Sequence, residues 1–201
     1  VLGKPEDRSK YPESDPRWFW SSWNYEIPEV REKIFRVLED VCQRYDVDGL
    51  HLDYWRHIKF FPPTQKLKPV EPRHVEMMND LLRRIRQMTE REGRRRGRPL
   101  IIAASVPLTV ERSLFVGLDI KTWLKEDLVD VLAGDGGYTP QAMAPQVRAL
   151  TALTHQYGVP FYPCISRKGM VKGPLDRTVE AWRGTAMNIW HAGGDGVFVY
   201  D

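Results

Sequence analysis

Two aspartates follow strand-like segments of this 201-residue chain, and together they could carry out acid–base chemistry. Asp53 ends a short alternating segment, and Asp135 lies among glycines after an apolar segment. Two carboxyl groups that flank a glycosidic bond can cleave it, because one donates a proton while the other attacks the sugar or activates water. Asp53 and Asp135 are therefore the candidate catalytic pair. Each also has a purely structural alternative: Asp53 would order the next loop, and Asp135 would support a turn.

Further polar and aromatic residues near these aspartates could bind a sugar. His51 shares a strand face with Asp53, although it could instead be a histidine of the core. Aromatic rings suit the C–H faces of sugars, and polar tips suit their hydroxyls. Arg167 follows the fourth strand-like segment, where it could bind a ligand or could instead be a solvated surface residue. The full set of candidate substrate-binding residues is His51, Trp55, Arg56, His57, Tyr138, Arg167 and Asp201.

Two other classes of function compete with sugar cleavage. His51 and Asp53 on one strand face, completed by Asp135 and Asp201, could hold a metal ion in a metal-dependent sugar-processing enzyme. Only one histidine is evident at that place, so the leading hypothesis uses no metal and no cofactor. A carbohydrate-binding barrel without catalysis is the third hypothesis.

The candidate residues need a framework in which short strands alternate with helices. Apolar strands that alternate with helices indicate an α/β fold, in which helices cover a parallel sheet. A dinucleotide-binding fold has no support, because no glycine-rich phosphate motif follows any strand. The predicted strands are Val47–Trp55, Leu100–Val106, Leu128–Ala133, Val159–Ile165 and Gly196–Tyr200, and the predicted helices are Pro28–Tyr45, Pro72–Glu92, Ile120–Glu126, Pro145–Tyr157 and Thr178–Ala192.

A (β/α) barrel, or part of one, is the architecture that this order favours, and barrel active sites lie at the C-terminal ends of the strands. Leu50 and Leu52 are apolar and should face the helices. Because strand side chains alternate, His51 and Asp53 should then point into the barrel. Asp135 has the same parity as Ala133, which we expect to place it at the same mouth.

Composition excludes several classes of protein. The net charge of +3 is too small to imply a nucleic-acid partner, and 42% apolar residues with many aromatics argue against disorder. No apolar run approaches the roughly 18 residues of a membrane span. Cys42 and Cys164 are too few for a disulfide framework. The chain begins with Val1 and stops just after an apolar run, so we expect a piece of a longer protein, and the compartment stays open, with export compatible.

The sequence resembles the bacterial glycoside-hydrolase-like barrel proteins often called family 10-like glycosyl hydrolases. The resemblance begins at Pro28–Arg31 and is most specific in Tyr45–Tyr54, which reads Tyr-Asp-Val-Asp-Gly-Leu-His-Leu-Asp-Tyr. It extends over roughly residues 28–201, in an uncharacterised branch. Further similar segments are Gly117–Asp130, Tyr157–Cys164 and Glu180–Gly196.

This resemblance implies a (β/α)8 TIM barrel of which the chain is the C-terminal part, about strands 4–8. The chain would then be one partial domain, with a loop-rich entry segment at 1–27 and βα units at 28–201. The remainder of the barrel would lie upstream of residue 1, and carbohydrate would be the substrate. Family 10 xylanases carry a Glu after strand 4 and another after strand 7, whereas this chain has Asp53 and no carboxylate in 164–167. Retaining glycosidases with Asp after strands 4 and 6 match Asp53 and Asp135 better.

Overall fold

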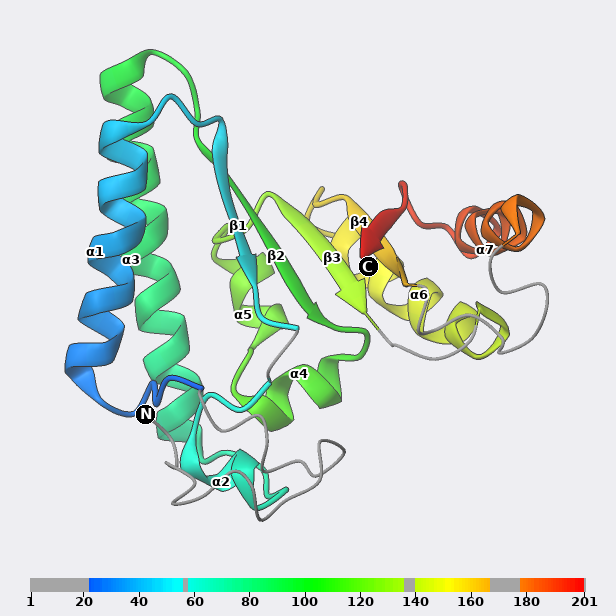
Figure 1. Ribbon diagram of the computed structural model, residues 1–201, viewed down its shortest axis with the longest axis horizontal. Helices are drawn as coiled ribbons and strands as arrows, with labels where there is room; N and C mark the ends of the chain where they lie inside the picture. The colour runs from blue at the N-terminus through cyan, green and yellow to red at the C-terminus, as the bar shows by residue number, and fades with distance from the viewer. Residues whose placement is uncertain (1–21, 56–57, 136–139, 167–177, 201) are drawn as a thin grey trace.

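Five parallel strands and seven helices alternate along the described part of the chain, residues 22–55, 58–135, 140–166 and 178–200 of the computed structural model (Figure 1). The α/β prediction is therefore confirmed. The helices are α1 (Pro28–Arg44), α2 (Pro62–Gln65), α3 (Pro72–Arg96), α4 (Val110–Val116), α5 (Ile120–Lys125), α6 (Pro140–His155) and α7 (Val179–His191), and the strands are β1 (Gly49–Asp53), β2 (Ile101–Pro107), β3 (Val131–Asp135), β4 (Phe161–Ser166) and β5 (Phe198–Tyr200).

The strands follow one another in the sheet in chain order, β1-β2-β3-β4-β5, and every neighbouring pair is parallel. A sheet wound always in one direction keeps its helices on one face, as in a barrel, whereas a doubly wound sheet reverses its order at a switch point. The five strands form a curled half-barrel, which is the architecture of part of a TIM barrel.

The two faces of the sheet differ as the alternation of the sequence predicts. On β1, Leu50 and Leu52 are buried, whereas His51 and Asp53 are exposed on the opposite face. The buried residues belong to a core that continues into β2 and into α3, α5 and α6. His51 and Asp53 therefore lie on the concave face, and the predicted parity of β1 is confirmed.

A contact between the two edge strands shows how strongly the sheet curls. The His51 ring of β1 meets the Phe198 ring of β5 edge-on, with the ring centroids 5.2 Å apart. In a flat sheet four strand spacings of about 4.8 Å would separate these strands by about 19 Å. The two side chains can touch only because the sheet bends until its first and last strands face each other across the concave side.

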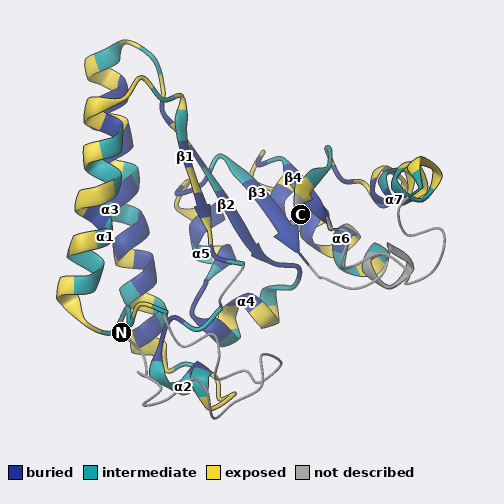
Figure 2. Cartoon of the chain, viewed as in Figure 1, coloured by how far each residue is buried: buried dark blue, intermediate teal, exposed yellow. Residues whose placement is uncertain are grey.

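The helices cover the convex side unevenly. Met78, Leu82, Ile85 and Met88 of α3 lie on one stripe at helical spacing, and all are buried. Figure 2 shows this buried stripe, and it also shows that α7 is far more exposed. Among the helices that the structure describes, none has both the length and the apolar character needed to cross a membrane.

Helix α3 ends later than the sequence predicts. The glycine at position 93 was expected to end the helix, yet α3 continues to Arg96. A Cβ at Gly93 would lie 3.0 Å from the carbonyl oxygen of Arg98, so this glycine permits a close approach of the returning chain. Gly97, with φ of 70°, is the residue that ends the helix, and the N–H groups of Gly97 and Arg98 bond back to Arg94 and Gly93 in a Schellman motif.

Other boundaries also differ from the prediction. Strand β3 spans Val131–Asp135 rather than Leu128–Ala133, so Asp135 is the last residue of the strand and not part of a following loop. Helix α6 begins at Pro140 and includes Pro145, which was predicted to start it. Pro145 is the sixth residue of α6, beyond the first turn, so it removes one hydrogen bond of the helix. The short helices α2 and α4 were not predicted.

Candidate functional site

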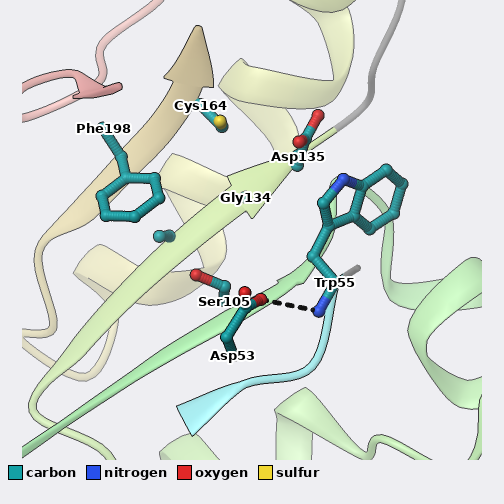
Figure 3. A pocket seen from close by; sticks show the side chains of 8 residues that line it. Asp53, Trp55, Ser105, Gly134, Asp135, Cys164 and Phe198 are labelled. Atoms are coloured by element: carbon teal, nitrogen blue, oxygen red, sulfur yellow. Dashed lines mark hydrogen bonds between the residues drawn. The ribbon is translucent and has the colours of Figure 1, made fainter. Parts of the chain in front are cut away.

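The concave face carries a small hollow at the C-terminal ends of the strands, with an internal volume of about 10 Å³, roughly the space of one water molecule. It collects side chains that are far apart in the sequence. Figure 3 shows Asp53, Ser105 and Asp135 near the ends of β1, β2 and β3, with Phe198 of β5 on the other side and with the Asp135 carboxyl group turned away from that of Asp53. The described lining consists of Asp53, Trp55, Ser105, Ala133, Gly134, Asp135, Cys164 and Phe198.

Asp53 is held at the end of β1 by its own loop. Its Oδ1 accepts a hydrogen bond of 3.0 Å from the backbone N–H of Trp55, which is drawn as a dashed line in Figure 3. This Asx turn fixes the carboxylate and redirects the chain as β1 ends. Asp53 therefore does order the loop that follows it. This contact is compatible with a chemical role for Asp53, because its side chain is exposed and lines the hollow. Among the described residues, none forms a hydrogen bond with its Oδ2.

Asp135 occupies a more enclosed position at the end of β3. Its residue is 5% exposed, and its backbone carbonyl accepts a hydrogen bond from Leu108 N–H. The preceding residue, Gly134, faces the helix side, where an added Cβ would lie 2.5 Å from the Phe161 ring. Glycine at 134 therefore lets β3 approach β4 and the core closely while Asp135 turns to the concave side.

The strand register fixes the spacing of the two aspartates. Asp53 is paired with Ser105, and Ser105 with Ala133, so Asp135 lies two strands away and two residues further along. Two strand spacings of about 4.8 Å and a rise of about 6.6 Å give a Cα separation of about 12 Å before curvature shortens it. Side chains on one face of a sheet stand roughly parallel to one another, so the two carboxyl groups should lie about 10–12 Å apart, and less where the sheet curls.

His51 lies one layer below this hollow, next to a serine. Its Nε2 is 2.7 Å from Ser105 Oγ, and its ring contacts Phe198 edge-on. Because Ser105 also lines the hollow, the imidazole is linked to the candidate site through that hydroxyl. The histidine is not among the described lining residues, so it is placed to support the site from beneath.

Tyr54, between Asp53 and Trp55, belongs to the opposite face of the sheet. It is buried against Phe60 and Trp123, and burial raises its pKa well above the ordinary value, with a further rise from the neighbouring Tyr25. Tyr54 therefore stays a neutral core residue. Its backbone N–H bonds to the Ser105 carbonyl and ties the end of β1 to β2.

The sequence reasoning missed five residues that line the hollow: Ser105, Ala133, Gly134, Cys164 and Phe198. Inward parity could have identified Ser105, because it is a polar residue within the apolar run of β2 and lies on the face of Ala103. Five candidate residues lie outside the described residues, and their positions stay predictions. These are Arg56, His57, Tyr138, Arg167 and Asp201.

The alternative of a metal site can be compared with the described side chains. Within the described ranges, no group of three or more His, Cys, Asp or Glu side chains is arranged to hold a metal ion. Asp53 and Asp135 line one hollow, but His51 is turned toward Ser105. The fourth proposed ligand, Asp201, lies outside the described residues.

Comparison with known proteins yields structural neighbours and no sequence family. No protein-family model matches the sequence, and no curated protein matches it either. The chain is similar to 3-dehydroquinate dehydratase from Geobacillus kaustophilus HTA426, with a TM-score of 0.55 and 15% identity over 84% of this chain and 56% of that chain. A likeness at this identity concerns the fold alone.

Two glycoside hydrolase structures are also neighbours, with lower scores. One is a glycoside hydrolase family 18 N-acetylglucosaminidase from Paenibacillus barengoltzii, with a TM-score of 0.47 and 15% identity over 71% of this chain and 46% of that chain. The other is chitinase ChiA74 from Bacillus thuringiensis, with a TM-score of 0.46 and 14% identity over 71% of this chain and 25% of that chain. Likenesses with TM-scores below 0.5 are too weak to support an inference about the fold or function of this chain. The chain spans about half of the length of these neighbours, or less.

Proposed function

We propose that this chain forms part of the catalytic mouth of a glycoside hydrolase that cleaves an oligosaccharide or polysaccharide. One observation carries the proposal: two aspartates from separate strands, Asp53 and Asp135, line the same hollow together with the aromatic ring of Trp55. Glycoside cleavage needs two carboxyl groups on opposite sides of one bond, and an aromatic face to hold the ring next to them.

The surroundings of the two carboxyl groups suggest their roles. Asp135 is buried at the end of β3, and we propose it as the general acid that protonates the leaving oxygen. Asp53 is exposed, with its Oδ1 held by the N–H of Trp55, and we propose it as the base or nucleophile. Hydroxyl-binding roles are proposed for the candidates outside the described residues, and we propose that His51 acts on the site through the hydroxyl of Ser105.

The register supports one stereochemical outcome. Inverting glycosidases separate their carboxyl groups by about 6.5–9.5 Å to admit a water molecule, whereas retaining enzymes place them about 5–5.5 Å apart. The separation that the register gives, about 10–12 Å before the curl of the sheet shortens it, is far above the retaining distance and closer to the inverting range. We therefore propose that Asp53 activates water, rather than attacking the sugar directly.

The resemblance of Tyr45–Tyr54 to the family 10-like glycosyl hydrolases adds support from the sequence. In that interpretation β1 to β5 correspond to barrel strands 4 to 8, and Asp53 and Asp135 follow strands 4 and 6. A carbohydrate-binding barrel without catalysis remains the alternative, because the strand-7 carboxylate of the family 10 xylanases has no counterpart in 164–167.

The test is the substitution of each carboxyl group by its neutral amide. Asp53→Asn and Asp135→Asn should each reduce kcat on a hydrolysed glycan by about 10²- to 10⁴-fold, which is the usual contribution of one acid or base. Asp80→Asn, on an exposed position of α3, is the matched control and should keep full activity. Nuclear magnetic resonance of the first product should show an inverted anomeric carbon.

Three results would contradict the proposal in different ways. Full activity in both variants would exclude Asp53 and Asp135 as the catalytic pair. A retained anomeric configuration would exclude the inverting assignment. Binding of glycans by the unmodified protein without any cleavage across the panel, and with affinity unchanged in Asp53→Asn, would establish the non-catalytic barrel instead.

A further inference from the structure

A second groove, of about 680 Å³, lies on the helix side of the sheet and shares no residue with the concave hollow. Helices α3, α4 and α5 and the connection that leads into α3 form its walls. Ligand sites commonly enclose about 300–1,000 Å³, so this groove has the size of a binding site. The proposed sugar chemistry does not use it.

The inner wall of the groove is apolar and well fixed. Val70, Val75, Leu114 and Phe115 contribute apolar side chains, and Leu114 is 45% exposed. The N–H of Val70 bonds to the carbonyl of Phe115 at 3.1 Å, which fastens the connection before α3 to α4. Exposed leucine on a fixed wall presents apolar surface that a partner could cover without reorganisation of the groove.

The charged residues of the groove oppose the overall charge of the chain. Four carboxylates, Glu76, Glu111, Asp119 and Glu126, and one guanidinium, Arg83, line it, which gives four negative charges against one positive, or −3. The whole chain has a net charge of +3. A groove with this local sign attracts cations even though the protein as a whole repels them.

Arg83 does not offer its charge to an anionic ligand. Its Nε and Nη2 bond both carboxylate oxygens of Glu126 at 2.5 and 2.9 Å, and its Nη1 bonds Glu76 at 2.5 Å. The hydrogen bonds to these two carboxylates raise the pKa of Arg83, and Arg83 in turn lowers that of Glu126. This closed set joins α3 to α5 and still carries a net negative charge.

Two details indicate where a cation would sit. Glu111, in the first turn of α4, is exposed and takes part in none of the ion pairs found among the described residues. Next to it, the guanidinium of Arg112 lies 5.7 Å from the centroid of the Phe115 ring. The chain's own Arg112 therefore already makes the cation–π contact with Phe115, and the carboxylate of Glu111, rather than this ring, is the position for a partner's cation.

We propose that this groove docks a basic amphipathic segment of a partner protein, with apolar side chains on Leu114 and Phe115 and lysines or arginines at the acidic rim. The carboxylates come from three helices, so a segment that carries several cations satisfies them better than one small amine does. The partner also needs apolar side chains to cover the apolar wall, which a purely charged ligand lacks. A helix that lays one apolar face into such a groove is a common mode of recognition.

The experiment measures binding of a fluorescein-labelled 14-residue amphipathic peptide of leucine and lysine by fluorescence anisotropy, with the whole protein at low salt. Leu114→Ser should weaken binding about tenfold, because it removes a buried leucine side chain from the complex. Glu111→Lys should weaken it several-fold at low salt and less at high salt, because salt screens rim charges.

Each variant has a matched control. Met187→Ser removes an exposed apolar side chain from α7, and Glu29→Lys reverses an acidic residue in the first turn of α1, as Glu111→Lys does in α4. Both controls should bind the peptide as the unmodified protein does. Thermal melts of all four variants show that the fold is retained, since every substituted residue is exposed.

Three outcomes would overturn the proposal. If Leu114→Ser and Glu111→Lys bound the peptide with the same affinity as their controls, the groove would be excluded as its binding site. Equal binding of a scrambled peptide of the same composition would show charge attraction alone, and full competition by spermidine at the peptide's own concentration would show a site for small cations. The result is independent of glycan cleavage, because Asp53→Asn should bind the peptide normally.

Discussion

Gly134→Ala tests whether close packing behind the site holds Asp135 in place. Gly134 lies in β3 directly before Asp135. Its added Cβ would lie 2.5 and 2.7 Å from two carbons of the Phe161 ring and 3.0 Å from Leu108 Cδ1. Carbon atoms in contact normally lie about 3.5–4.0 Å apart, so the ring has to move by about 1 Å. Phe161 is completely buried, which leaves no open space for that movement.

The expected cost follows from these distances. Adding a methyl group to a well-packed core lowers the free energy of unfolding by about 1–3 kcal/mol. The loss of backbone freedom in the unfolded chain returns about 0.4–1 kcal/mol of this when Gly becomes Ala. We expect a net destabilisation of about 1–2 kcal/mol for Gly134→Ala. The same substitution at Gly184 in α7, where an added Cβ meets nothing within 4 Å, should stabilise the protein by about 0.5–1 kcal/mol.

Urea denaturation followed by circular dichroism measures both variants. Adding Phe161→Leu to Gly134→Ala should recover part of the loss, because leucine lacks the ring atoms that the new Cβ meets. The double-mutant cycle should therefore show a favourable coupling of about 0.5 kcal/mol or more. A stable Gly134→Ala variant, or strictly additive effects of the two substitutions, would refute the packing argument.

Two ionic contacts away from the site give further predictions. Asp130 Oδ2 accepts the Ile102 N–H at 2.6 Å and lies 3.0 Å from Arg86. The Arg86 side chain is 12% exposed and that of Asp130 is 32% exposed, so Asp130→Ala should lower the free energy of unfolding by about 1–3 kcal/mol. Burial opposes the charge of Asp195, but hydrogen bonds from Phe161 N–H and His155 outweigh it and lower its pKa. Asp195 therefore stabilises the fold above about pH 4, and Asp195→Asn should lose less stability than the unmodified protein between about pH 5 and 2.

Controls separate these effects from general charge removal. Asp40→Ala breaks an exposed pair with Arg44 and should change the free energy of unfolding by less than about 1 kcal/mol. Adding Arg86→Met to Asp130→Ala should recover stability, since no unpaired charge stays buried. A mild effect of Asp130→Ala, or identical acid unfolding of Asp195→Asn and the unmodified protein, would contradict the two assignments.

Local periodicity predicted much of the framework, because it depends only on residues close in sequence. The alternation of Leu50 and Leu52 with His51 and Asp53 predicted both faces of β1, since successive strand side chains point to opposite sides. Local sequence patterns did not predict the end of α3 or the presence of α4 correctly, because the patterns there fit more than one structure. Gly93 resembles a helix end but permits a close approach, and the seven-residue α4 is too short for a clear helical repeat.

The parity of Asp53 and of Asp135 could thus be predicted from each strand alone, and the structure places both on the concave face. Their spacing could not, because it depends on the register of β1, β2 and β3. The hydrogen bond between His51 and Ser105 and the contact between His51 and Phe198 depend on register and on sheet curvature. Sequence by itself determined which way each side chain points. Only the tertiary structure decided which of them meet, because a local pattern specifies the face of a strand, whereas the curl of five strands sets the distance across it.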